Sequence, residues 1–534
     1  MSHPPGGSKR TRPTTGPDVG RILWTRHAAC VVLLLACSAC LRRPTPNPNI
    51  LVVAIPSGPN NLDPRLGLDD ASQKIHQLIF DNLMELDDHM RVTPKLAERL
   101  DHPTPTTYVV TLRQGIRFHD GHELTSADVV YTFRSFLDPD FVSGRKGGYR
   151  ELHSVDATGP YTVVFTLDKP FTSFPINLVM PIVPNGAGAS LSRQPVGTGP
   201  YRFLRYAVDD QLELEPFNEY FGGRPRNEGL VVKIVPDDIM RGLELRKGTT
   251  DMVINDLTPD IAYQLEKSDR LQMVEAAGVD YQYLGLNLRN PVLTDVRVRQ
   301  ALAYAIDTRS IIKYLRRGLG APATGLLPQQ SWASAPDLQP YPHDPARARE
   351  LLDEAGYRDP DGDGPALRLR LSLKISSSQE FNRLQASVIQ QNLREVGVDL
   401  DVRTYELATL FADVQKGNFQ MYVLQYTAGS LADPDMLRRA FHSNQAPPEG
   451  FNRGHFSDPR VDALLDEAAS STDEAHRLDL FQQVQRLVAI ELPYISLWNK
   501  TNFIIAQRSL AGVRVSTLGD LTFLKDVARI HPEP

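Results

Sequence analysis

The distribution of apolar and polar residues predicts a strand and then a helix near the start of the folded body. Residues 50–55 form a short β-branched run, and the turn-forming cluster 56–60 follows it. Within 71–86, apolar residues recur at helical spacing, at Ile75, Leu78, Ile79 and Leu83. We therefore expect a strand over 50–55 and an amphipathic helix over 71–86.

Strands and helices alternate along the rest of the chain. A helix begins near Thr125, after a strand and a glycine turn, and mixed strands and turns occupy 161–235. Further helices are expected over 295–314, 345–356, 380–396, 458–469 and 476–491. Further strands are expected over 367–375, 399–405, 494–497 and 503–506. This βαβ order predicts an α/β region over 286–495.

The N-terminal segment indicates export. Basic residues precede an apolar run over 28–39, which at about twelve residues is shorter than the roughly 20 that a membrane-spanning helix needs. The run is typical of a signal peptide. It ends in small residues before a cysteine, which resembles a bacterial lipobox, and we expect a lipid on Cys37, with Cys40 as the alternative.

These features predict a signal peptide over 1–40, a flexible tether over 41–49 and a body outside the cytoplasm. We expect the protein in the periplasm or at the cell surface, anchored to the membrane by an N-terminal lipid. An uncleaved anchor helix remains the alternative, and it leaves the body on the same side.

Composition excludes several classes of protein. All three cysteines lie in the predicted signal peptide, so the body has neither a disulfide nor thiol chemistry. The formal net charge of -6 over 534 residues gives no support for nucleic-acid binding.

Fragments that imitate catalytic or metal-binding motifs are incomplete. His119 and His122 lack a third ligand with suitable spacing, and 197–199 lacks the Lys and Ser/Thr of a phosphate loop. The sequence gives no specific arrangement of a nucleophile, a base and an oxyanion donor, which a catalytic site would need. We therefore expect a binding protein and not an enzyme, without a cofactor, a metal site or a catalytic residue.

Several stretches occur in a characteristic order, namely 61–64, 112–131, 195–201, 220–225, 295–301, 305–307, 433–435 and 461–465. Together they resemble the family 5 extracellular solute-binding proteins, the receptors of peptide and nickel ATP-binding-cassette (ABC) importers. The resemblance covers nearly all of 50–515.

The resemblance implies an α/β fold of the type II periplasmic-binding-protein kind, with two hinged lobes and an inserted domain. Lobe I would combine 50–75, 185–284 and 500–534, the inserted domain would span 76–184, and lobe III would span 285–499. The ligand would lie between the lobes and favour their closure.

The residues expected to bind the ligand lie at the hinge and after the strands of lobe III. Aromatic residues at the two lobe crossings can line the cleft floor or pack in the core, and Asn287 can bind a peptide backbone or cap the fold. The loop 426–435 follows a strand, where ligands bind in α/β lobes. The candidates are Tyr281, Tyr283, Asn287, Tyr426, Thr427, Ser430 and Trp498. Asp433 is expected to be a turn residue, because Pro434 follows it.

One departure from the dipeptide receptors of the family concerns charge. Those receptors share an Asp in this loop, which binds the ligand's ammonium group. They also share an Arg in the loop after a preceding strand, which binds its carboxylate. A gap-free match places Gly429 and Ser376 at these positions. Ser376 is therefore a further candidate, and a free dipeptide would be poorly held.

The expected function is an ABC-importer receptor that binds oligopeptides and delivers them to permease and ATPase subunits, as a monomer. The alternatives are the same fold with a nickel complex, a sugar or an opine as its solute, and a sensory receptor.

Overall fold

The computed structural model describes residues 49–362, 366–377, 380–448 and 450–530. The predicted signal peptide and both candidate lipidation residues, Cys37 and Cys40, lie outside these residues. Within the described part of the chain, no helix is long and apolar enough to cross a membrane.

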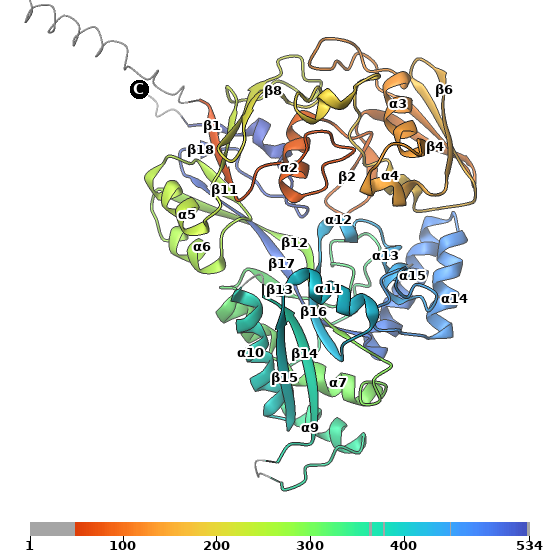
Figure 1. The fold of residues 1–534 in the computed structure, drawn as a ribbon, viewed down its shortest axis with the longest axis vertical. Coiled ribbons are helices and arrows are strands. Elements are labelled where there is room, and N and C mark those ends of the chain that lie inside the picture. The colour runs from red at the N-terminus through yellow and green to blue at the C-terminus, as the bar shows by residue number, and fades with distance from the viewer. Residues whose placement is uncertain (1–48, 363–365, 378–379, 449, 531–534) are drawn as a thin grey trace, which may run out of the picture. The chain divides into compact units, whose positions relative to one another are not determined.

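The described residues contain one mixed sheet of eleven strands, in the order β15-β14-β16-β12-β17-β11-β1-β10-β9-β8, with β13 paired to β17 (Figure 1). Its strands are β1 (Leu51–Ile55), β8 (Tyr201–Ala207), β9 (Gln211–Pro216), β10 (Leu230–Ile234), β11 (Met252–Ile254), β12 (Leu271–Leu286), β13 (Gly320–Pro322), β14 (Leu369–Ser376), β15 (Val398–Tyr405), β16 (Met421–Tyr426) and β17 (Tyr494–Gln507). We call β1 and β8–β11 the first strand group and β14–β16 the second strand group.

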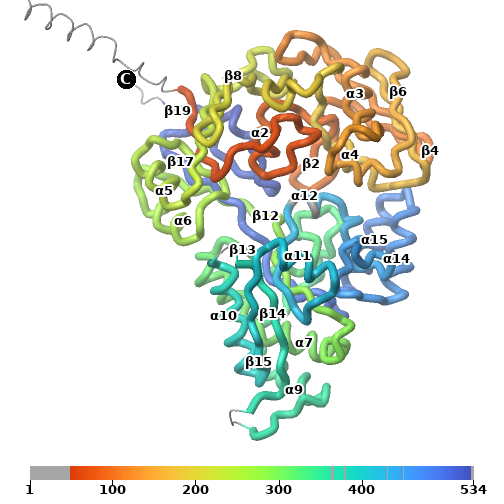
Figure 2. Tube along the Cα trace, in the orientation of Figure 1, coloured from red at the N-terminus to blue at the C-terminus, as the bar shows by residue number. Residues whose placement is uncertain are grey.

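The two strand groups are joined by β12 and β17, which run antiparallel along each other (Figure 2). The C-terminal half of β17 pairs with β11, and the C-terminal half of β12 pairs with β16. Register shifts interrupt the β12–β17 ladder between Ala277 and Tyr281 and between Gln282 and Tyr283. The chain therefore passes between the two strand groups through β12 and β17, which pair with each other.

Helices pack on both strand groups. Those around the first group are α2 (Asp70–Ile79), α5 (Asp238–Lys247) and α6 (Pro259–Glu266). Those around the second group are α7 (Val296–Ala305), α8 (Thr308–Ser310), η3 (Ile311–Leu315), α9 (Pro345–Glu354), α10 (Glu380–Arg394), α11 (Leu407–Lys416), α12 (Ala428–Leu431), α13 (Met436–Phe441), α14 (Pro459–Ser470) and α15 (Glu474–Glu491).

A separate four-stranded sheet follows α2 in the chain. It has the order β4-β5-β7-β6 and is covered by α3. The elements of this region are β2 (Met84–Leu86), β3 (Val92–Pro94), β4 (Ala97–Thr104), β5 (Thr107–Leu112), α3 (Ser126–Leu137), η1 (Gly144–Tyr149), β6 (Leu152–Gly159), β7 (Thr162–Leu167), α4 (Phe174–Asn177) and η2 (Ala189–Ser192). The C-terminal part adds β18 (Leu510–Ala511), η4 (Thr522–Asp526) and β19 (Ala528–Arg529).

Two predicted helices end earlier than the apolar pattern suggested. The helix expected over 71–86 stops at Ile79, because Phe80 turns to extended backbone and the chain enters β2. The helix expected over 295–314 ends at Ala305, because Asp307 accepts hydrogen bonds from the backbone and hydroxyl of Ser310 and starts a new turn.

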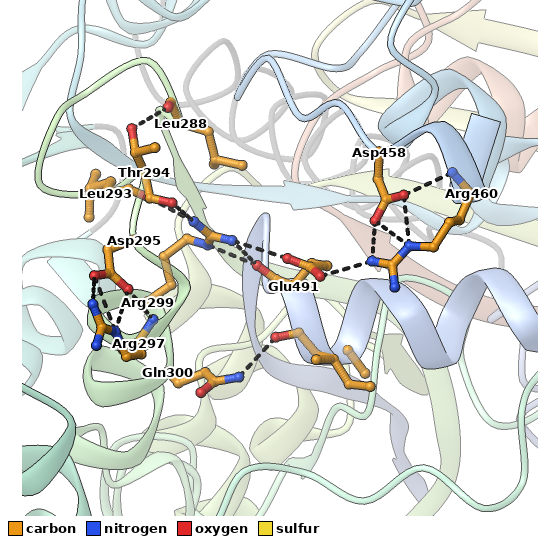
Figure 3. Close-up of polar contacts among 12 residues, drawn as sticks. Leu288, Leu293, Thr294, Asp295, Arg297, Arg299, Gln300, Asp458, Arg460 and Glu491 are labelled. Carbon is orange, nitrogen blue, oxygen red and sulfur yellow. Dashed lines mark hydrogen bonds and ion pairs between the residues drawn. The ribbon is translucent and has the colours of Figure 1, made fainter. Parts of the chain in front are cut away.

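The buried side chain of Arg299 stabilises the segment that follows β12 (Figure 3). Arg299 donates hydrogen bonds to the carbonyl oxygens of Leu293, Thr294 and Glu491. The Glu491 carboxylate also forms an ion pair, at 3.1 Å, with Arg460 at the start of α14. Arg299 thus joins α7 to the end of α15. The basic residues of the motif 295–301 therefore have a structural role.

Candidate ligand-binding cavity

A cavity of about 1140 Å³ lies between the region of the four-stranded sheet and the helices after β16. Its first wall comes from η1, α4 and the segment 169–179, and its second wall from α12, α13 and the residues Gln445, Pro448, Gly450 and Phe451. Drug-sized ligand sites are roughly 300–1,000 Å³. The cavity therefore has room for a solute of that size or larger.

An acidic pair, Asp433 and Asp435, lies in the second wall, and a hydrogen bond from the first wall reaches it. The Ser173 hydroxyl donates to Asp433 Oδ1 at 3.1 Å, and the backbone N–H of Asp435 donates to the same oxygen at 2.8 Å. Burial raises the pKa of Asp433. Burial, and then the neighbouring charge of Asp433, raises the pKa of Asp435 to about 7. The acidic pair therefore binds protons readily while no cation is bound.

Basic side chains contribute most of the other charge in the cavity wall. They are Arg145, Arg150, Lys169, Arg438 and Arg439. Lys169 is paired with Glu151 at 3.1 Å, and Arg438 is paired with Asp466. The remaining arginines have no carboxylate within 4.0 Å among the described residues. Among the described residues, the wall therefore carries positive charge that no carboxylate neutralises at close range, although Arg145 donates to the Pro64 carbonyl oxygen.

The aromatic residues predicted at the hinge lie in the interior. Tyr283 is fully buried and stacks on Tyr281, Tyr426 and Tyr494 at ring distances of 4.5–5.5 Å. Trp498 is buried against Phe381. Tyr281 lines a second, small cavity of about 40 Å³, which has room for a few water molecules.

Two polar candidates are engaged within the fold. The Asn287 amide donates to the carbonyl oxygens of Gly417 and Phe419, and its oxygen accepts from the Arg289 N–H. This is the capping arrangement that the sequence left open. Ser376 is buried at the end of β14 and has a polar contact of its own. Neither residue lines the large cavity.

The loop after β16 does reach the large cavity, through Gly429, Ala432, Asp433 and Asp435. Tyr426 is buried at the end of β16, and its hydroxyl has no hydrogen-bond partner among the described residues. Thr427 is exposed and precedes α12. Ser430 lies within α12, and its side chain lies outside the described part of the structure. The ligand roles of the predicted residues stay predictions.

The cavity residues that the sequence left out are mainly charged. Asp433 makes the expected turn and also faces the cavity, and Arg439 and Phe451 form the wall beside it. A signal was present, because 433–439 concentrates two acids and two arginines just after the predicted ligand loop. Ser173 carried no such signal.

The two glycine-rich motifs, 119–122 and 197–199, form one structural unit. His119 Nε2 donates to the Gly199 oxygen at 2.9 Å, and its Nδ1 accepts from the Gly197 N–H at 3.3 Å. Burial lowers the pKa of His119 to about 4, so the neutral ring fills both roles. A side chain at Gly199 would meet the Ile79 carbonyl carbon at 2.6 Å. These residues hold α2 against the four-stranded sheet region.

The family model of bacterial extracellular solute-binding proteins, family 5, matches residues 91–448. The chain belongs to this family. Family 5 members are solute-binding proteins of importers and not enzymes, so the expectation of a binding protein outside the cytoplasm is confirmed. The predicted α/β fold is confirmed as well.

Relatives within family 5 bind different solutes. The glutathione-binding protein GsiB of Pectobacterium atrosepticum is 31% identical over 460 residues, which cover 84% of this chain and 88% of the relative. The oligopeptide-binding protein AppA of Bacillus subtilis, solved with a nonapeptide, is 25% identical with a TM-score of 0.71 and covers 90% of this chain and 99% of its own. HbpA2 of Haemophilus parasuis is 26% identical with a TM-score of 0.80, covering 90% and 100%.

Proposed function

We propose that this protein binds oligopeptides in the large cavity and delivers them to the permease of an ABC importer. The observation that carries this proposal is the cavity of about 1140 Å³, which has an acidic pair and unpaired arginines in its wall. A peptide has an ammonium group, a carboxylate and a backbone that hydrogen-bonds along its length. Gln73, Asn177, Gln415 and Gln445 line the cavity and supply amide groups for such a backbone.

We further propose that Asp433 and Asp435 receive the peptide's ammonium group. Gly429 occupies the position where the resemblance expects an acid, and these two carboxyl groups lie in the same cavity wall. A bound cation favours the ionised carboxylates, so binding would release a proton near neutral pH. The similarity to an oligopeptide-binding protein and to a glutathione-binding protein, both with peptide ligands, supports this substrate class.

The proposed division into lobes is supported by the hydrophobic cores. One core lies within 83–182, two combine residues of 51–79 and 183–271 with the C-terminal part, and two lie mainly within 279–498. We also propose that the lipid on Cys37, or on Cys40, holds the protein at the membrane. Palmitate labelling of the wild type and of the Cys37→Ala and Cys40→Ala variants assigns the residue.

Peptide binding is tested on the full-length protein purified from its cells. Mass spectrometry of the released ligand should identify unmodified peptides, and calorimetry with synthetic peptides of two to nine residues should give saturable binding. Recovery of a metal complex or a sugar, with no binding to any peptide length, would contradict the proposal. Recovery of cleaved peptides would contradict a receptor role.

A further inference from the structure

The ring of Phe451 in the cavity wall makes cation–π contacts with two arginines. The guanidinium carbon of Arg439 is 4.4 Å from the centre of this ring, and that of Arg453 is 5.3 Å from it. Phe451 and Arg439 line the large cavity, whereas Arg453 does not line it and lies near the rings of Tyr426 and Phe411. Two positive charges therefore converge on one side chain of the wall.

In the described part of the chain, no carboxylate lies within 4.0 Å of either guanidinium group, and Arg439 attracts Asp433 and Asp435 only from farther away. Arg453 is 7% exposed, and its side chain donates to the Tyr283 hydroxyl at 3.2 Å, whereas its Nε has no partner among the described residues. The buried Tyr426 hydroxyl, whose ring lies 6.0 Å from the Arg453 guanidinium carbon, has no hydrogen-bond partner among the described residues either. Two buried polar groups with donor capacity, the Arg453 Nε and the Tyr426 hydroxyl, thus lie next to Phe451 without a partner in the described part of the chain.

Such an arrangement is unfavourable unless an anion completes it. A buried charge is normally paired, and a buried donor without an acceptor is destabilising. The aromatic rings around Arg453 compensate part of this through cation–π contacts, but they supply no acceptor for its Nε. The neighbouring Arg438, also in the wall, shows the usual solution, because Asp466 pairs with it.

Resting on the peptide-binding function proposed above, we propose that Arg439 and Arg453 form an anion subsite that takes a carboxylate of an acidic peptide. Arg439 would meet the carboxylate in the cavity. A shift of the partly buried Phe451 ring would expose the Arg453 Nε and the Tyr426 hydroxyl to it. Guanidinium groups bind carboxylates through two parallel hydrogen bonds, which makes Arg the residue suited to this ligand.

The test uses alanine tetrapeptides in which a single Glu or Gln is moved through the four positions, each with a free or an amidated C-terminus. Calorimetry on the full-length wild type should show the best Glu peptide binding about ten- to a hundredfold more tightly than its Gln counterpart, the range expected for one charge-assisted hydrogen bond. If instead only C-terminal amidation weakens binding, the subsite takes the terminal carboxylate.

Variants assign the effect to the subsite. Arg453→Met and Arg439→Met should each reduce the preference for the carboxylate to less than about threefold and leave the affinity for the uncharged counterpart within about threefold. Arg438→Met is the matched control, because this wall arginine already has Asp466 as its partner, and it should keep the preference. Arg439 is exposed, so its variant keeps the test valid if Arg453→Met fails to fold.

The outcomes separate the two proposals. Equal binding of the Glu, Gln and amidated peptides to the wild type overturns the anion subsite and leaves peptide binding intact. A variant that weakens charged and uncharged peptides alike also overturns it, because the arginines would then serve the fold. Absence of binding by every peptide overturns the proposed function and the subsite with it.

Discussion

The hydroxyl of Ser173, on the first wall of the cavity, donates a hydrogen bond to Asp433 on the second wall, at 3.1 Å. This contact joins two segments that are 260 residues apart in the chain. It also stabilises the ionised form of Asp433, the form that the proposed ammonium site requires.

Ser173→Ala should therefore weaken peptide binding. One hydrogen bond is worth about 0.5–1.5 kcal/mol, which corresponds to roughly two- to tenfold in the dissociation constant. Calorimetry with a peptide that binds the wild type measures this. The control is Ser387→Ala, which removes an exposed hydroxyl of α10 that bonds only to the Arg383 carbonyl oxygen. Equal affinity of Ser173→Ala and the wild type would show that the contact has no part in binding.

Asp435 makes stability depend on pH in the opposite direction to most carboxyl groups. Its pKa is raised to about 7 in the folded protein, so the folded state holds a proton that the unfolded state releases near pH 4. The free energy of unfolding therefore falls as pH rises from about 4 to 7. Asp435→Asn removes this dependence and should be more stable than the wild type at pH 8, by on the order of 1–3 kcal/mol, with little difference at pH 4.

Urea unfolding of the ligand-free protein at pH 4, 6 and 8 measures the Asp435 effect. A variant that is less stable than the wild type at pH 8 would contradict the prediction. The same pKa predicts that peptide binding strengthens between pH 6 and 8 and releases a proton. Calorimetry in buffers with different ionisation enthalpies detects that release.

His119 gives the free energy of unfolding a second pH dependence, below pH 6.5. Its pKa is lowered to about 4 by burial, so the unfolded state binds a proton below pH 6.5 that the folded state does not. The free energy of unfolding should fall as pH decreases from 6.5 to 4. His119→Gln should be less stable at pH 7, by about 1–2 kcal/mol, and should lose less stability between pH 7 and 5. His89→Gln, at an exposed position, should keep the wild-type slope.

Gly199 is required by the close approach of α2. An added Cβ would lie 2.6 Å from the Ile79 carbonyl carbon and 2.8 Å from its oxygen, so the backbone must shift. Gly199→Ala should lower the free energy of unfolding by about 1–3 kcal/mol. Gly188→Ala is the control, because its Cβ would meet nothing within 4 Å. Equal thermal midpoints for the two variants would contradict the assignment.

Most of the secondary structure could be predicted from local patterns. The helix that begins after Thr125 has the expected acidic residue in its first turn, since Asp128 closes a capping box with Thr125. The strand pair expected over 494–497 and 503–506 is one strand, β17, because the polar residues 499–502 between them continue the ladder with β12. Local polarity did not reveal that pairing, which depends on residues more than 200 positions away.

The candidate site was harder to predict, for a physical reason. Aromatic residues at a strand crossing have the same composition whether they face a ligand or a core, and Tyr283 and Trp498 are buried in the core. The wall of the cavity comes from η1, α4 and α13, which are far apart in the sequence. Only the loop after β16 was predictable, because ligands collect at the carboxyl ends of strands in α/β folds.

The long strands β12 and β17 also decide how this chain can be divided experimentally. A recombinant piece spanning 287–493 would contain β14, β15 and β16 but would leave β16 without the partner it has over Tyr281–Leu286. Such a bare edge invites self-association, so that piece should aggregate. Two co-expressed pieces cut at a surface turn outside both strands would keep every ladder intact and should reassemble into the native receptor.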